Sequence, residues 1–194
     1  PHIASRDGME AVQGFIAGYQ ATKNPRFLRR AIEGTDFLLR MIRIGHWPFG
    51  IAWPLEGRYK AQDCFFFYAG ALIFAQMYAL TGERKYLTRG AIPFADKIIA
   101  DHIRADGAFG TSAPTEDSHH VNRKGGLAGV FVNDDGIGVA LLAVYAVTGD
   151  SRYLDAAVGS ADFWTRATEA PAALAVYPCV ALLLADVYRL TGDR

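Results

Sequence analysis

A pair of adjacent acidic residues is the feature of this sequence best suited to chemistry. Asp134 and Asp135 stand between Asn133 and Gly136, directly before a long apolar segment. Glycoside cleavage needs two carboxyl groups, one to protonate the leaving oxygen and one to act as base or nucleophile. A carboxylate at a helix N-terminus is held ionised by the helix dipole, which suits the base or nucleophile. The alternative is capping, with Asn133 as N-cap and acidic residues in the first helical turn.

Two further acidic residues stand where apolar helices are expected to begin. Asp63 is 15 residues before Tyr78, and Asp134 is 11 residues before Tyr145. Both spacings are close to whole helical turns, so each carboxylate is predicted to share a face with its tyrosine. Asp63 and Asp134 would then converge on one cleft, and Asp7 begins the first apolar helix in the same way. Helix-start acidity alone is the competing explanation.

Two adjacent histidines, His119 and His120, lie in the longest predicted loop with Glu116 and Asp117 close by. A loop histidine can act as acid or base near neutral pH, or contact a sugar carboxylate. Zinc would require at least three ligands at defined spacing, and neither a paired-cysteine nor an HExxH motif occurs in the sequence. We therefore expect the histidines to assist catalysis, with a solvated loop as the alternative, and we expect no metal and no cofactor.

Aromatic residues gather in the predicted link between residues 44 and 61. Sugar rings present C–H faces that stack on indoles, and an arginine can pair with a uronate carboxylate through two parallel hydrogen bonds. The same tryptophans could instead plug the end of a helical array. We expect the link to bind substrate, together with Asp63 and Asp7, through Trp47, Trp53, Arg58 and Tyr59.

A repeated phrase indicates which elements position these residues. Tyr-x-x-Thr occurs four times, at 19–22, 78–81, 145–148 and 188–191, and an aromatic–leucine pair follows the first three copies. Such repetition indicates one supersecondary unit used several times. Glycines 82, 149 and 192 fit the left-handed position after a helix C-terminus. Each copy therefore predicts the end of one helix and the start of the next.

The repeats divide the sequence into two kinds of helix. Strongly apolar segments predict inner helices at about 7–22, 62–81, 134–148 and 172–190. Segments that mix charge with apolar residues at helical spacing predict outer helices at about 25–43, 84–103 and 151–168. No run of alternating strand residues stands out, so the predicted class is all-α, with three helical hairpins and one unpaired inner helix. The long links at 44–61 and 104–133 both lead to inner-helix N-termini and mark that end as the site.

Inner and outer helices joined by turns of the form Y-x-x-T-G-[DE]-x-x-[YF]-L resemble the α/α-toroid superfamily. Its members include six-hairpin glycosidases, N-acylglucosamine 2-epimerase-like isomerases, uronate-acting enzymes and the helical domain of glucuronyl C5-epimerases. The resemblance covers nearly the whole chain and concerns the scaffold. It implies a substrate cleft where the long links meet the inner helices, and some toroid glycosidases carry tandem aspartates at a place comparable to Asp134 and Asp135.

The number of predicted hairpins is small for that class. A complete ring has about six hairpins, and this sequence predicts little more than half of them. We therefore expect residues 1–194 to form a single partial toroid domain, completed by the remainder of a larger chain or by a second copy. The final helix would otherwise leave a large apolar face exposed.

Composition excludes some classes of partner. Twenty basic and twenty acidic residues cancel, and without a basic footprint we expect no nucleic-acid binding. Residues 64–82 are uncharged, but they contain two glycines and Gln76 and end in the repeat turn, so a buried helix is expected rather than a membrane span. The leading expectation is an enzyme that acts on a glycan or uronate-containing sugar by hydrolysis, elimination or epimerisation. The alternative is a non-catalytic helical-repeat module that binds or scaffolds within a larger assembly.

Overall fold

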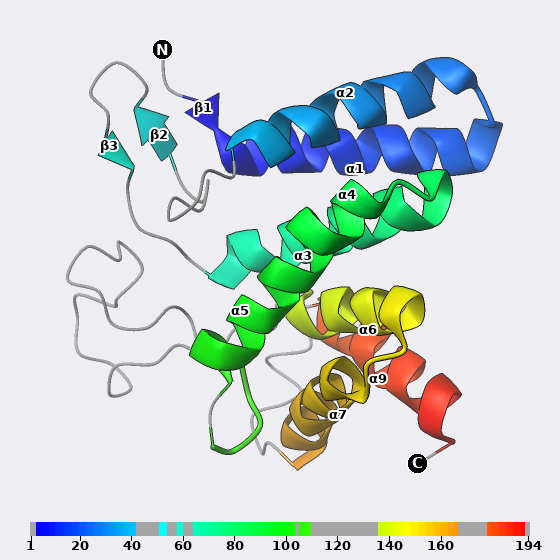
Figure 1. The fold of residues 1–194 in the computed structure, drawn as a ribbon. Helices are drawn as coiled ribbons and strands as arrows, with labels where there is room; N and C mark the ends of the chain where they lie inside the picture. Colours follow the sequence, from blue (N-terminus) through cyan, green and yellow to red (C-terminus); the bar gives the residue numbers. More distant parts are fainter. Residues whose placement is uncertain are drawn as a thin grey trace.

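The computed structural model describes residues 3–41, 51–53, 58–59, 64–103, 105–109, 136–166 and 178–192 (Figure 1). Helices dominate these residues, which confirms the all-α class. The helices are α1 (Ser5–Thr22), α2 (Pro25–Met41), α3 (Cys64–Thr81), α4 (Arg84–Tyr86), the π-helical turn η1 (Leu87–Ala91), α5 (Ile92–His102), α6 (Ile137–Thr148), α7 (Ser151–Arg166) and α9 (Pro178–Thr191). The strands are β1 (Ile3–Ala4), β2 (Ile51–Trp53) and β3 (Arg58–Tyr59).

The helices form two layers in the order that the repeats predicted. In the inner layer α1 packs on α3, α3 on α6 and α6 on α9. In the outer layer α2 pairs with α1, the α4–η1–α5 segment pairs with α3, and α7 pairs with α6. Each outer helix also contacts the next inner helix, as α2 does with α3 and α7 with α9. The described chain is therefore a curved array of three hairpins followed by one inner helix (Figure 1).

The threonine of each repeat phrase closes the end of its inner helix. The hydroxyl of Thr148 donates to the carbonyl oxygen of Val144 at 2.8 Å and accepts the backbone N–H of Asp150 at 3.2 Å. Gly149 follows at φ 71°, and its N–H donates to the carbonyl oxygen of Tyr145 at 2.8 Å. These bonds satisfy carbonyl groups that have no partner further along the helix. The same bonds recur in the copies that end at Thr22 and Thr81.

The next helix begins at once, because the following residue caps it. The carboxylate of Asp150 accepts the backbone N–H of Arg152 at 3.1 Å, and the amide oxygen of Asn24 accepts that of Arg26 at 3.0 Å. Hydrogen bonds from the Arg152 side chain and backbone hold the pKa of Asp150 below its usual value. Asp and Asn are among the residue types favoured at this position. In the first copy Lys23 takes the left-handed position, at φ 56°.

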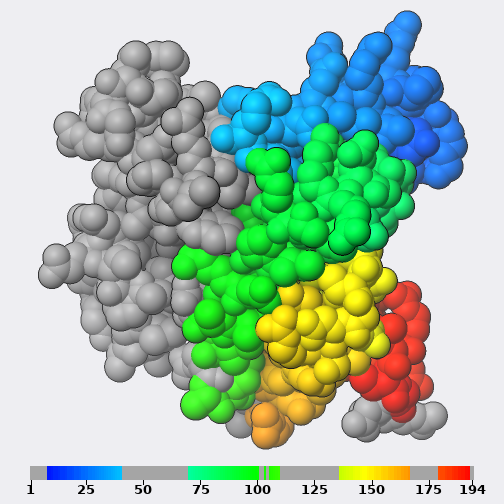
Figure 2. Space-filling view, viewed as in Figure 1, coloured from blue at the N-terminus to red at the C-terminus, as the bar shows by residue number. Residues whose placement is uncertain are grey.

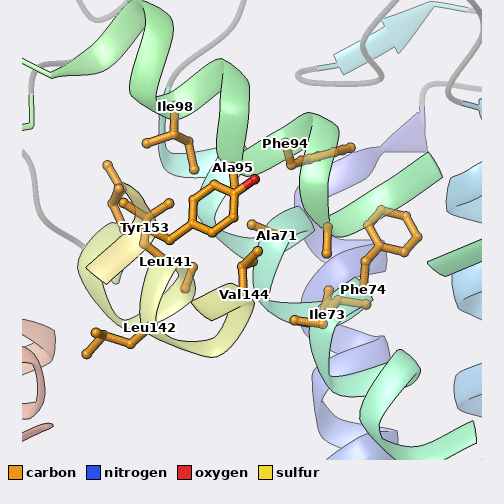
Figure 3. Packing of buried hydrophobic residues seen from close by; sticks show 14 of the residues in the cluster. Ala71, Ile73, Phe74, Phe94, Ala95, Ile98, Leu141, Leu142, Val144 and Tyr153 are labelled. Atoms are coloured by element: carbon orange, nitrogen blue, oxygen red, sulfur yellow. The ribbon is translucent and has the colours of Figure 1, made fainter. Parts of the chain in front are cut away.

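The core fills the space between the layers with large side chains. Phe74 of α3 stacks on Tyr86, with ring centroids 6.5 Å apart, and meets Phe94 edge-on at 5.5 Å. Glycines make this contact possible: a Cβ on Gly70 would overlap the Phe94 ring, and one on Gly90 would overlap Phe74. Tyr153, Leu141 and Val144 continue the same cluster into the third hairpin (Figure 3).

The structure contains two features that the sequence did not predict. The strands β1, β2 and β3 form an antiparallel sheet in that order, although no strand was predicted. Elements of two or three residues are too short to show an alternating pattern. The second outer helix was predicted as one continuous helix, but the structure interrupts it with the π-helical turn η1. None of the described helices has the length and hydropathy needed to cross a bilayer.

Candidate functional site

The end of the array that carries the inner-helix N-termini is the predicted site. Figure 1 shows the short turns after α1, α3 and α6 at one end and the beginnings of these helices at the opposite end. The sheet lies at that opposite end, because β1 runs directly into α1. The inner helices therefore run in the same direction, and the structure gathers their N-termini as the sequence predicted.

The sheet brings the described part of the aromatic link to the start of α1. Residue Ala52 of β2 pairs with Ile3 of β1 on one side and with Tyr59 of β3 on the other. Trp53 stands directly opposite Arg58 in the same ladder. Three of the predicted substrate-binding positions, Trp53, Arg58 and Tyr59, are thus joined by strand pairing beside the helix whose first turn contains Asp7. The remaining predicted residues, Trp47, Asp63, His119, His120, Asp134 and Asp135, lie outside the described residues.

The start of α6 corrects one interpretation of the acidic pair. The helix was expected to begin near residue 134, but it begins at Ile137 with Gly136 as its N-cap residue. Gly136 has φ 101°, which a right-handed helix excludes, and as a glycine it has no side chain with which to cap the helix. The first turn of α6 contains no acidic residue. The prediction that Asn133 is the N-cap residue and that the aspartates lie in the first turn of α6 is therefore wrong. The shared-face argument for Asp134 and Tyr145 is wrong too, because it needed helix from 134 onwards.

The backbone that follows the acidic pair is held firmly. Gly136 is buried, and its carbonyl oxygen accepts the N–H of Ala140 at 2.9 Å. Gly138 lies against Leu183 of α9, so closely that a Cβ there would come within 2.6 Å of a leucine methyl group. Ile137 is fully buried. Asp134 and Asp135 therefore immediately precede one of the most tightly packed points of the inner layer.

The described start of the second link is anchored as well. After α5, Ile103 pairs with Phe109 in an isolated β-bridge, and the Phe109 side chain is fully buried. Gly107, at φ 90°, lies so close to α7 that a Cβ would come within 2.5 Å of the Gly159 carbonyl oxygen. The link that contains His119 and His120 thus leaves the array from a fixed point on the third hairpin.

The described groups with shifted pKa values lie on the outer helices or at their N-caps. Burial raises the pKa of Tyr86, and a 2.8 Å hydrogen bond from its hydroxyl to Asp36 raises it further. Burial alone would raise the pKa of Asp36, but hydrogen bonds from Lys85 and Tyr86 outweigh it and hold the pKa below its usual value. The contacts of Asp36 with Tyr86 and Lys85 join the first hairpin to the second. They were not predicted from the sequence. No group of three or more metal-ligating side chains occurs among the described residues.

Two hollows in the described surface contain none of the predicted site residues. One, of about 310 Å³, is lined by Ala105, Asp106, Phe163 and Arg166 beside the anchored link. The other, of about 370 Å³, is a groove between α7 and α9.

This arrangement of alternating inner and outer helices is that of an α/α toroid. Neither a family model nor a curated protein matches the chain, but solved structures do. Cellobiose 2-epimerase from Bacillus thermoamylovorans matches with a TM-score of 0.70 and 12% identity, over 85% of this chain and 45% of the epimerase. A glycoside hydrolase family 76 mannosidase from Bacteroides thetaiotaomicron matches with a TM-score of 0.69 and 17% identity, over 100% of this chain and 56% of the mannosidase.

A third solved structure is an α-1,6-mannanase from Salegentibacter in complex with α-1,6-mannotetrose. It matches with a TM-score of 0.57 and 14% identity, over 84% of this chain and 45% of the mannanase. The crystallised protein is an inactive variant in which two consecutive aspartates are replaced by alanine. The chain therefore shares the α/α-toroid fold with these proteins and spans about half of their length.

Proposed function

We propose that this chain is part of a carbohydrate-active toroid enzyme and that Asp134 and Asp135 carry its chemistry. The proposal rests on one observation: a tandem acidic pair directly precedes the tightly packed start of inner helix α6, whose N-cap is Gly136. The Salegentibacter mannanase, which has the same fold, is inactive in a variant that lacks two consecutive aspartates.

The reaction that we propose is hydrolysis of a glycosidic bond. Two carboxyl groups are what this reaction requires, one as the acid that protonates the leaving oxygen and the other as the base or nucleophile. His119 and His120, in the link anchored at Gly107, would assist by holding or moving a proton. Elimination or epimerisation of a uronate-containing sugar would use the same carboxylates as bases.

Substrate binding is assigned to the sheet end of the array. Trp53, Arg58 and Tyr59 follow one another across the β2–β3 ladder beside the start of α1. Aromatic rings stack on sugar faces, and a guanidinium pairs with hydroxyl or carboxylate oxygens. Trp47, Asp63 and Asp7 are proposed to line the same cleft. Because the chain spans about half of its structural neighbours, the opposite wall is proposed to come from a further part of a larger chain or from a second copy.

The test is turnover of a defined oligosaccharide. The chain is incubated with α-1,6-mannotetrose and with a uronate-containing oligosaccharide, and products are followed by mass spectrometry. We expect cleavage that is lost in Asp134→Asn and Asp135→Asn and retained in Asp155→Asn, an exposed carboxylate on α7. Equal activity in all the variants would overturn the assignment of the acidic pair.

A non-catalytic binding or scaffold module is the second candidate, favoured by the half-length match to known enzymes. It predicts sugar binding without turnover, with the affinity unchanged by Asp134→Asn. Titration calorimetry with the same oligosaccharides separates the two candidates.

A further inference from the structure

The outer helices are joined by a contact that occurs twice. The hydroxyl of Tyr86, at the start of the second outer segment, donates to Asp36 of α2 at 2.8 Å. The hydroxyl of Tyr153, at the start of α7, donates to Asp96 of α5 at 2.9 Å. A cation stands beside each tyrosine: Lys85 lies 2.9 Å from Asp36, and Arg152 lies 3.4 Å from Asp96. Each outer helix therefore offers a carboxylate to the tyrosine and cation of the next.

The same position in the third outer helix is Asp162. It follows Tyr153 by nine residues, as Asp36 follows Phe27. Asp96 follows Tyr86 by ten residues, and the π-helical turn between them accounts for the extra one. Buried neighbours confirm the alignment, because the residue two positions further on is almost fully buried in every case: Leu38, Ile98 and Trp164.

Asp162 differs from its two counterparts in having no partner for its carboxylate among the described residues. The residue is exposed, and apart from the backbone bonds of α7 its described hydrogen bonds are those that its carbonyl oxygen accepts from the side chains of Thr165 and Arg166. It lies at the edge of the groove between α7 and α9. The groove is lined by Val158, Ala161, Asp162, Thr165, Leu184, Val187, Tyr188 and Thr191.

The α9 side of the groove resembles the surface of α3 on which the ring of Tyr86 packs. Leu184 stands four residues before Tyr188, as Phe74 stands four residues before Tyr78. The ring of Phe74 stacks on the ring of Tyr86. Leu184 is therefore the residue on which an equivalent tyrosine ring would pack. Apolar side chains on α9 are left in contact with solvent: Leu182 is 58% exposed, Leu190 50% and Tyr188 47%. Figure 2 shows α9 (red) at the far side of the described surface from α1 and α2 (blue).

The turn after α9 repeats the local bonds of the earlier turns. Thr191 donates to the carbonyl oxygen of Val187 at 2.9 Å, Gly192 has φ 70°, and its N–H donates to Tyr188 at 2.8 Å. The three earlier copies of this turn each lead directly into an outer helix that packs beside the inner one.

We propose that the groove between α7 and α9 seats a further outer helix of the same polypeptide. Its first turn presents a tyrosine hydroxyl to Asp162, and the preceding residue is a lysine or arginine that pairs with the same carboxylate. The ring of that tyrosine packs on Leu184. The proposal does not depend on any catalytic role of Asp134 and Asp135.

The test adds such a helix as a probe. A copy of residues 150–166 is attached directly after Gly192, which places a second copy of the Tyr153 hydroxyl opposite Asp162. We expect the extended chain to melt at a higher temperature and the backbone amides of α9 to exchange more slowly with deuterium. Asp162→Ala should lower the melting temperature of the extended chain by roughly 2–4 °C and leave that of the original chain unchanged. When the tyrosine of the attached helix is replaced by phenylalanine, Asp162→Ala should lower the melting temperature of the extended chain by less. Asp155→Ala should leave the melting temperature of both chains unchanged.

Several results would overturn the proposal. One is an unchanged exchange rate in α9 after the helix is attached. Another is an effect of Asp162→Ala that is equal in both chains. A third is a dimer of the original chain that Tyr188→Glu converts to a monomer, because a second copy would then occupy the groove.

Discussion

Tyr153 on α7 and Asp96 on α5 form a 2.9 Å hydrogen bond across the boundary between the second and third hairpins. Tyr153 is 1% exposed, whereas the Asp96 side chain is 44% exposed, so the bond joins the buried face of one outer helix to the open face of another. Burial raises the pKa of Tyr153, and the bond to Asp96 raises it further. The boundary between these two hairpins thus contains a specific polar link beside its apolar contacts.

We predict that Tyr153→Phe destabilises the fold by about 1 kcal/mol. A hydrogen bond to a charged group contributes roughly 1.5–3 kcal/mol, and the partial exposure of Asp96 reduces that figure. Urea unfolding followed by circular dichroism measures the change. Tyr145→Phe is the control, because the Tyr145 hydroxyl has no hydrogen bond within the described part of the chain. Equal losses in the two variants would contradict the prediction.

Asp36→Asn is predicted to remove a contribution to stability that depends on pH. The folded-state pKa of Asp36 lies below its usual value, because hydrogen bonds from Lys85 and Tyr86 outweigh the opposing effect of burial. The ionised carboxylate therefore stabilises the fold fully above the unfolded pKa of about 3.9 and loses this contribution as pH falls through the folded pKa.

Urea unfolding of both proteins from pH 7 to pH 3 tests this. We expect the stability gap to be widest near neutral pH and to close in acid. Lys85→Met should reduce the same pH-dependent contribution, since the Lys85 ammonium lies 2.9 Å from Asp36. A gap of constant size across this range would show that the charge of Asp36 is not its cause.

Gly149→Ala is predicted to destabilise the fold by about 1–2 kcal/mol, the cost of the left-handed conformation for a residue with a Cβ. Gly149 has φ 71°, and no described atom would crowd the added methyl group. Gly14→Ala is the matched control: it lies inside α1, also with open space, and should stabilise by roughly 0.5–1 kcal/mol. Thermal unfolding of the two variants should shift in opposite directions.

Asp134→Asn and Asp135→Asn are predicted to leave the melting temperature almost unchanged while abolishing turnover. The N-cap residue of α6 is Gly136, so neither variant replaces the N-cap residue or a residue of the first turn. Differential scanning calorimetry beside the oligosaccharide assay provides both measurements. A fall of several degrees with activity retained would assign the pair a structural role.

The hairpins could be predicted because the repeated turn phrase contains the residues that end one helix and begin the next. Thr148, Gly149 and Asp150 end one helix and begin the next through bonds within nine residues, from Val144 to Arg152. The sheet was missed because the pairing of Ile3 with Ala52 is a long-range contact between very short strands. The start of α6 was misplaced because the acidic pair looks like a first helical turn. The positive φ of Gly136, a backbone property that the pair does not reveal, places the start at Ile137.

The site was predictable only as a region. Helical spacing relates residues that share one helix, but it cannot relate Asp134 to Asp63 across two separate links. Strand pairing places Trp53, Arg58 and Tyr59 close together in the structure. In the sequence these residues were grouped because of their aromatic and basic side chains, not because of their spacing.

The π-helical turn at Leu87–Ala91 has a consequence for how the repeats vary in length. One additional residue is absorbed within a single turn, so Tyr86 and Asp96 both keep the orientation that their counterparts have in the regular helices. The array can thus accept an insertion in one unit without shifting the contacts on either side of it. Deleting one residue between Leu87 and Ala91 should give a regular α-helix that still engages both neighbours.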